Sequence, residues 1–119
     1  MSDSESRETK RATVSDDVIA GYVYDTVLKT QGVYGMGIGL SASAVAKNIL
    51  GYDKRSRGIR VVFDEESGYT IDVNMVVEFG VNIPETAWNV QKRVFEGLKT
   101  ECGIETENIN IHVQGVHAK

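Results

Sequence analysis

The sequence predicts an α+β fold, a two-layer sandwich in which two long helices cover one face of a small mixed sheet. Three observations lead to this prediction. Apolar residues recur at helical spacing in two long segments, they alternate with period two in three others, and each predicted strand has one polar face. A sheet with one apolar face needs cover on that side only. The expected order is helix, hairpin, helix, strand.

Composition is typical of a globular domain. The chain has 119 residues, 41% of them hydrophobic and 25% charged, which is enough for one hydrophobic core. Residues 1–11 lack periodic apolar positions and are expected to form a disordered tail, so residues 12–119 are predicted to be a single domain. The chain lacks a run of about 20 apolar residues and an apolar signal segment, which argues against direct membrane insertion. The lone Cys102 cannot form an internal disulfide, and the protein is expected to be cytoplasmic.

The first helix is expected to start at Ser15 and to end near Gly32. Ser15 is a favourable N-cap, and Asp16 and Asp17 suit the positive end of the helix dipole. Gly32 stands where a left-handed C-cap is expected. Val18, Tyr22 and Thr26 form one i, i+4 row, and Ile19, Val23 and Val27 form the next, which gives an apolar stripe at helical spacing.

The stretch "QGVYGMGIGL", residues 31–40, carries four glycines and raises the question of a phosphate-binding loop. It fits neither a dinucleotide fingerprint, which needs a third glycine where Leu40 stands, nor a P-loop, because Lys47 is flanked by Ala46 and Asn48. A flexible or closely packed connector is the favoured interpretation. A short helix is expected over residues 40–50, ending at Gly51.

Two strands and a turn are expected after Gly58. Residues 59–64 alternate with period two, "EESG" turns the chain, and residues 69–79 alternate again. The apolar row of the second strand is expected to be Tyr69, Ile71, Val73, Met75, Val77 and Phe79.

A second helix is expected from Pro84 to about Cys102, closed by Gly103. Its core row would be Ile83, Ala87, Val90, Val94, Leu98 and Cys102. The final strand alternates Ile109, Ile111 and Val113 with polar residues. Because a helix connects it to the preceding strand, these two strands are expected to be parallel.

No catalytic, cofactor or metal site is expected. Cys102 lies on the apolar row of its helix, where a free cysteine usually acts as a small hydrophobe, and no third group orients it with His112 or His117. The two histidines have opposite strand parity and are expected to point to different faces unless Gly115 interrupts the pleat.

Two polar regions are candidates for contact with a partner. Residues 47–60 carry five basic residues against one acidic residue, within a chain of net charge −4, and Lys54, Arg55 and Arg57 are its candidates. A solvated loop is the favoured alternative. The polar sheet face would be either plain solvated surface or a docking platform, and its residues are Arg60, Thr70, Asp72, Asn74, Glu78, Asn110, His112 and Gln114.

Trp88 and Phe95 stand one heptad apart at the edge of the second helix's core row. The favoured interpretation is that they complete the core, as most large aromatic residues do. The alternative is that they are partly exposed and anchor an interface.

Three stretches together resemble the alkaline shock protein family of Gram-positive bacteria: "VSDDVIAGYVYDTVLKTQGV", "VVEFGVNIPETAWNVQKRV" and "INIHVQGVH". The resemblance covers about residues 12–117. It implies a small, cytoplasmic, non-enzymatic protein that is abundant under stress and that a membrane-spanning partner holds at the membrane in some members.

The resemblance therefore implies a cell-envelope stress response protein that acts through protein–protein association near the cytoplasmic face of the membrane. Its expected partners are another protein, membrane-anchored in some members, and a second copy of the chain. The alternative function is a small nucleic-acid-binding module that uses the basic segment 47–60. This alternative is weaker, because the segment lacks a G-x-x-G clamp loop and the polar strand face lacks aromatic residues for stacking.

Overall fold

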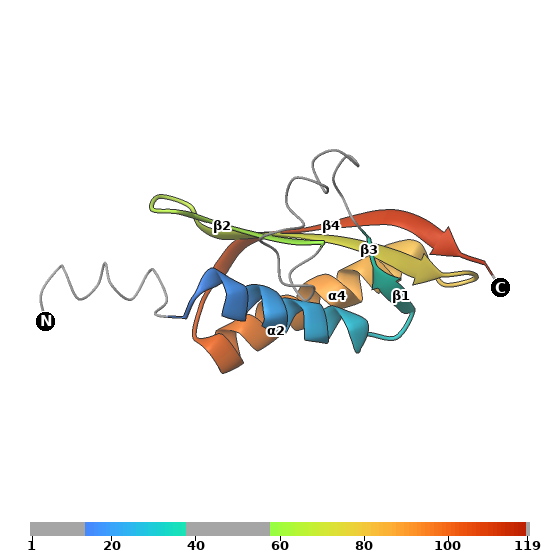
Figure 1. Cartoon of the computed structure of the whole chain (residues 1–119), viewed down its shortest axis with the longest axis horizontal. Helices are drawn as coiled ribbons and strands as arrows, with labels where there is room; N and C mark the ends of the chain where they lie inside the picture. The colour runs from blue at the N-terminus through green and yellow to red at the C-terminus, as the bar shows by residue number, and fades with distance from the viewer. Residues whose placement is uncertain (1–13, 38–57, 119) are drawn as a thin grey trace, which may run out of the picture.

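The longest inner strand, β3, organises the sheet. The computed structural model describes residues 14–37 and 58–118. Figure 1 shows both helices on one side of the sheet, as an α+β fold requires. In chain order the elements are α2 (Asp16–Leu28), β1 (Val33–Met36), β2 (Ile59–Asp64), β3 (Gly68–Glu78), α4 (Ile83–Gly97), the π-helical turn η3 (Leu98–Cys102) and β4 (Thr106–His117).

Helix α2 begins where the sequence predicts and ends earlier. The Ser15 hydroxyl accepts a hydrogen bond from the Val18 backbone N–H at 3.3 Å, so the predicted N-cap is confirmed. The helix has 13 residues, with a right-handed C-cap at Lys29. Gly32 is left-handed, with φ +96°, but it belongs to the turn before β1 and does not cap the helix. The expectation of two long helices is therefore corrected, because α2 is short.

The alternation of β3 creates the core. Tyr69, Ile71, Val73, Met75 and Val77 are each at most 1% exposed, on the side that faces the helices. The predicted hairpin is confirmed, because β2 pairs antiparallel with β3 from Ile59↔Val73 to Asp64↔Gly68. The predicted row was wrong at its end: Phe79 follows the strand in a turn and is 75% exposed.

Strand β1 was not predicted. The residues Val33–Met36, expected to form a connector, pair antiparallel with β3 over Val77 to Met75. Strands β1 and β2 therefore occupy successive lengths of the same edge of β3. The predicted helix over residues 40–50 lies outside the described residues.

The two strands on this edge meet at Asn74. The Gly37 N–H donates to the Asn74 carbonyl at 2.7 Å, and the Asn74 N–H donates to the Gly58 carbonyl at 2.9 Å. A Cβ atom at Gly58 would lie 2.5 Å from the Gly37 carbonyl oxygen. The expectation of close packing thus holds at Gly37, where a Cβ atom would lie 2.5 Å from Gln114 Cγ, and the two described parts of the chain meet at Asn74.

Strand β4 covers the other edge of β3 and runs parallel to it, as predicted, from Tyr69↔Thr106 to Glu78↔His117. The register shifts twice, between Tyr69 and Thr70 and between Met75 and Val76. Each shift leaves one extra residue in β4, namely Glu107 and Gln114, and such bulges increase local twist.

Helix α4 is the second helix that covers the apolar face of the sheet. The Asn82 side chain caps it by accepting from the Glu85 N–H at 2.9 Å, and Pro84 lies in the first turn. Val90, Val94 and Leu98 of the predicted row are fully buried. Ile83 was predicted to be core but is 38% exposed, because it is the first residue of the helix. After Gly97 the helix widens into η3, which Gly103 closes in the predicted left-handed conformation, with φ +71°.

The meeting point of β1 and β2 can be tested with a matched pair of glycine variants. Gly58 and Gly68 have similar positive φ values, +86° and +83°, but a Cβ atom meets close neighbours only at Gly58. Gly68→Ala should cost about 1 kcal/mol of unfolding free energy from backbone strain alone. Gly58→Ala should cost about 2 kcal/mol more, because the added methyl group meets backbone. Thermal or urea denaturation measures both, and equal losses would contradict the close approach.

Candidate functional site

The groove between α4 and the start of β4 is the most distinctive surface of the described residues. It has a volume of about 410 Å³. We call it the aromatic groove, and its lining consists of Trp88, Gln91, Lys92, Phe95, Thr106, Glu107 and Ile109.

Helical spacing brings the α4 residues of the groove to one face. Gln91, Lys92 and Phe95 follow Trp88 by three, four and seven residues, which are the positions that share a helix face. Trp88 is 57% exposed and Phe95 is 42% exposed. The favoured prediction that they complete the core was therefore wrong. The buried row runs through Val90 and Val94, and the two aromatic side chains lie beside it.

Polar contacts fix the two walls of the aromatic groove. The Gln91 Nε2 donates to the Ile109 carbonyl at 2.7 Å and so ties α4 to β4. The Lys92 Nζ lies 5.2 Å from the centroid of the Trp88 ring, a cation–π contact that restricts the indole. Among the described residues, the buried Thr106 Oγ1 has no hydrogen-bond partner. The groove thus has an apolar floor at Ile109 and two aromatic residues on one wall, together with the polar side chains of Gln91, Lys92, Thr106 and Glu107.

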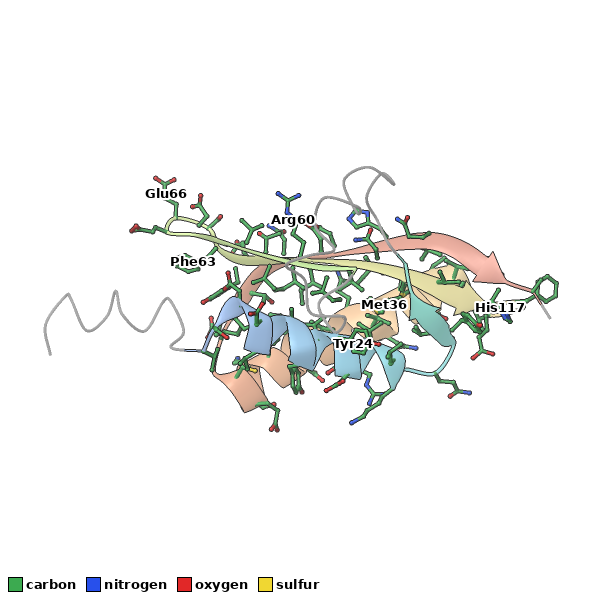
Figure 2. All side chains as sticks on the ribbon, in the orientation of Figure 1. Tyr24, Met36, Arg60, Phe63, Glu66 and His117 are labelled. Atoms are coloured by element: carbon green, nitrogen blue, oxygen red, sulfur yellow. The ribbon has the colours of Figure 1, made fainter. Side chains whose placement is uncertain are left out.

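The side of the sheet opposite the helices carries the predicted polar residues, and we call it the open face. Asn110 Nδ2 donates to Asp72 Oδ1 at 2.9 Å, and His112 Nε2 lies 3.6 Å from the same oxygen. Figure 2 shows Arg60 pointing away from the helices on this side.

Asn74 forms a second set of polar contacts on the open face. It accepts from Gln114 Nε2 at 3.2 Å and donates to the Gly58 carbonyl at 3.2 Å. The interaction candidates Asn74, Asn110 and His112 therefore take part in two separate sets of polar contacts between β3 and β4, one at Asp72 and one at Asn74. Since these hydrogen bonds satisfy much of their polar capacity, the contacts have a structural role whether or not a partner docks there.

A stacked pair of rings that the sequence did not predict lies between β1 and β4. The rings of Tyr34 and His117 lie 3.7 Å apart with an angle of 5° between their planes. Tyr34 belongs to β1 and His117 to β4, so the pair reaches across β3. Nothing in the sequence spacing links two residues from strands at opposite edges of β3.

The remaining candidates are not brought together into a site. Lys54, Arg55 and Arg57 lie outside the described residues, so the nucleic-acid alternative stays a prediction. Within residues 14–37 and 58–118, no three histidine, cysteine or acidic side chains are grouped so that they could hold a metal ion. In the same part of the chain, no helix is long and apolar enough to cross a membrane.

Cys102 is partly buried at the end of η3. Desolvation, and secondarily the nearby Glu101 carboxylate, raise the pKa of its thiol above the ordinary value. A raised pKa reduces the fraction of reactive thiolate at neutral pH, which is the opposite of what a nucleophile needs.

The thiol pKa gives a prediction on reactivity. Iodoacetamide should alkylate Cys102 of the folded protein more slowly at pH 8 than it alkylates the same chain in urea, where the thiol regains its ordinary pKa. The rate should continue to rise with pH above the value at which the unfolded thiol levels off. A folded thiol that reacts faster than the unfolded one would contradict this interpretation.

The exposure of Trp88 gives a prediction on stability. Trp88→Ala should lower the unfolding free energy by about 1 kcal/mol, or the melting temperature by about 5 °C, because the side chain is only partly buried. The fully buried Leu98 is the matched control, and Leu98→Ala should cost about 3 kcal/mol. Comparable losses in the two variants would restore Trp88 to the core.

Comparison with known proteins shows which family the chain matches. Residues 4–118 match the model of the alkaline shock protein 23 family, which is described as having a cell envelope-related function. The chain is 34% identical over 106 residues to the uncharacterized protein Spy1614 of Streptococcus pyogenes serotype M6, covering 87% of this chain and 84% of that protein. It is 31% identical over 103 residues to the uncharacterized protein YloU of Bacillus subtilis, covering 87% and 85%. No solved structure matches.

Proposed function

Because the chain belongs to the alkaline shock protein 23 family, whose function is cell envelope-related, we propose that it serves envelope homeostasis under stress by binding other proteins, without catalysis. It would act at the cytoplasmic face of the membrane, where a membrane-anchored partner would hold it. The aromatic groove is the observation that supports this proposal.

The groove has the chemistry of a protein-binding surface. Tryptophan at the centre of an interface often contributes more binding energy than its neighbours, especially next to an apolar pocket. Trp88 and Phe95 present such side chains at 57% and 42% exposure, beside the almost buried Ile109. Lys92 adds a positive charge at the rim, where charge contributes more to specificity than to affinity.

The proposal predicts that the aromatic groove keeps the protein at the membrane. In Bacillus subtilis cells that produce the full chain under alkaline stress, the protein should sediment with the membrane fraction. The double variant Trp88→Ser/Phe95→Ser should shift at least about tenfold toward the soluble fraction, since losing two aromatic anchors costs more than 1.4 kcal/mol of binding.

Val18 provides the matched control. Its side chain was predicted to belong to the apolar stripe of the first helix, which was wrong, because it is 54% exposed; it lies on α2 and does not line the groove. Val18→Ser should leave the distribution unchanged. A wild-type protein found only in the soluble fraction, or a double variant that remains with the membrane, would refute the proposed function.

A further inference from the structure

We propose that two copies of this chain pair along the outer edges of their β4 strands, antiparallel, so that the two sheets become one. This inference rests on the proposed function, because it makes a second copy of the chain one of the proteins that the chain binds. Four features of the described residues carry it: the free edge, its register, its charge and the position of the groove.

The first feature is the free edge itself. Strand β4 has 12 residues and pairs with β3 along one side, while no strand among the described residues pairs with the other. Edge strands are normally protected by charges, proline or a covering element. Between Asn108 and Val116, β4 contains no lysine, arginine, carboxylate or proline. The Gln91 side chain occupies one carbonyl of this edge, that of Ile109.

The second feature is a register in which β4 matches itself. The Ile109 carbonyl points away from β3, since it accepts from Gln91 of α4, and the backbone groups of alternate residues share a direction. The peptide groups of Ile111 and Val113 therefore face outward as well. An antiparallel pair centred on Ile111 sets Ile109 opposite Val113 of the second copy, so that outward peptide groups oppose one another.

Side-chain faces agree in the same register. Ile109 and Val113 both lie on the helix side of the sheet, because they pair with Ile71 and Met75. On the open face, Asn110 would oppose His112 and Asn108 would oppose Gln114. A shift by one residue would set apolar side chains opposite polar ones, so the alternation of β4 selects this pairing.

The third feature is charge. The chain has a net charge of −4, so two copies repel each other unless they meet at a neutral surface, and the centre of β4 is neutral. The nearest carboxylates are Glu105, which directly precedes β4, and Glu107, the second residue of β4. A parallel pair would set these carboxylates side by side, whereas an antiparallel pair places them at opposite ends and sets Glu105 opposite His117.

The fourth feature is the aromatic groove. A two-fold axis perpendicular to the sheet keeps the helices of both copies on one side, with each α4 beside the shared edge. Ile109, the floor of the groove, is two residues from the centre of the pair. Strand pairing would supply hydrogen bonds and register, and it would place the aromatic grooves of the two copies beside the same shared edge.

The register can be tested by charge exchange in the purified full chain. Sedimentation equilibrium should give wild type twice the 13.1 kDa mass of one chain. The double variant Asn108→Lys/Gln114→Lys would create two lysine–lysine pairs across the dimer and should raise the dissociation constant about tenfold. Asn108→Lys/Gln114→Glu would create two oppositely charged pairs and should restore a dissociation constant near that of wild type.

A charge-matched control tests whether added positive charge anywhere on the chain weakens the dimer. Glu65→Gln/Glu66→Gln also adds two units of positive charge, in the exposed turn between β2 and β3 that Figure 2 marks at Glu66, and should leave the dimer unchanged. Amide exchange gives a second measurement: the N–H groups of Ile111 and Val113 should exchange more slowly at dimer-forming concentration than in dilute solution. A wild-type monomer, or no recovery in the lysine–glutamate variant, would overturn the inference.

The two proposals fail separately. A monomeric protein that still requires the aromatic groove to sediment with membranes would overturn the β4 pairing and leave the proposed function standing. A dimer with the expected charge exchange that never sediments with membranes would refute the proposed function and retain the pairing.

Discussion

The fold depends on the burial of one face of β3. Five alternating side chains of this strand are at most 1% exposed, and every other strand of the described sheet is placed by hydrogen bonds to β3. Alternation forces the opposite face to be polar, and the polar contacts of Asp72 and Asn74 lie there. Helices α2 and α4 must then lie on the apolar side, where Val23, Val27, Val90 and Val94 complete the core.

The parts that depend on local pattern could be predicted from the sequence. The period of β3, the Ser15 cap, the left-handed Gly103 and the parallel pairing of β4 follow from a few neighbouring residues or from one crossover. Strand β1 could not be predicted in this way. It has four residues, includes Gly35, and exists because β3 leaves part of its edge for it to pair with. A strand formed by tertiary pairing leaves little signal in its own sequence.

Tertiary contacts likewise decide the features of the aromatic groove that the sequence could not predict. Helical spacing placed Trp88 and Phe95 on one face of α4, but their exposure depends on where β4 passes, and spacing cannot determine that. The Gln91 contact with Ile109, which joins residues 18 positions apart, is what sets this distance. The polar residues of the open face were predictable as a face, whereas the stack of Tyr34 on His117 required knowledge of the strand order.

The two edges of β3 are used in different ways, and this difference determines where another molecule can meet the sheet. On one edge, β1 and β2 meet at Asn74, so two short strands share that edge. On the other edge, β4 runs alongside β3 from Tyr69 to Glu78, with two bulges but no gap in pairing larger than a residue. A continuous strand keeps its outward peptide groups in one row, which is what pairing with another strand needs. Because α4 is tied to this strand at Ile109, the exposed aromatic residues are placed beside the continuous edge. Exposed aromatic side chains and a strand edge that no other described strand pairs with therefore occur together on one side of the molecule, although each follows from a separate feature of the sequence.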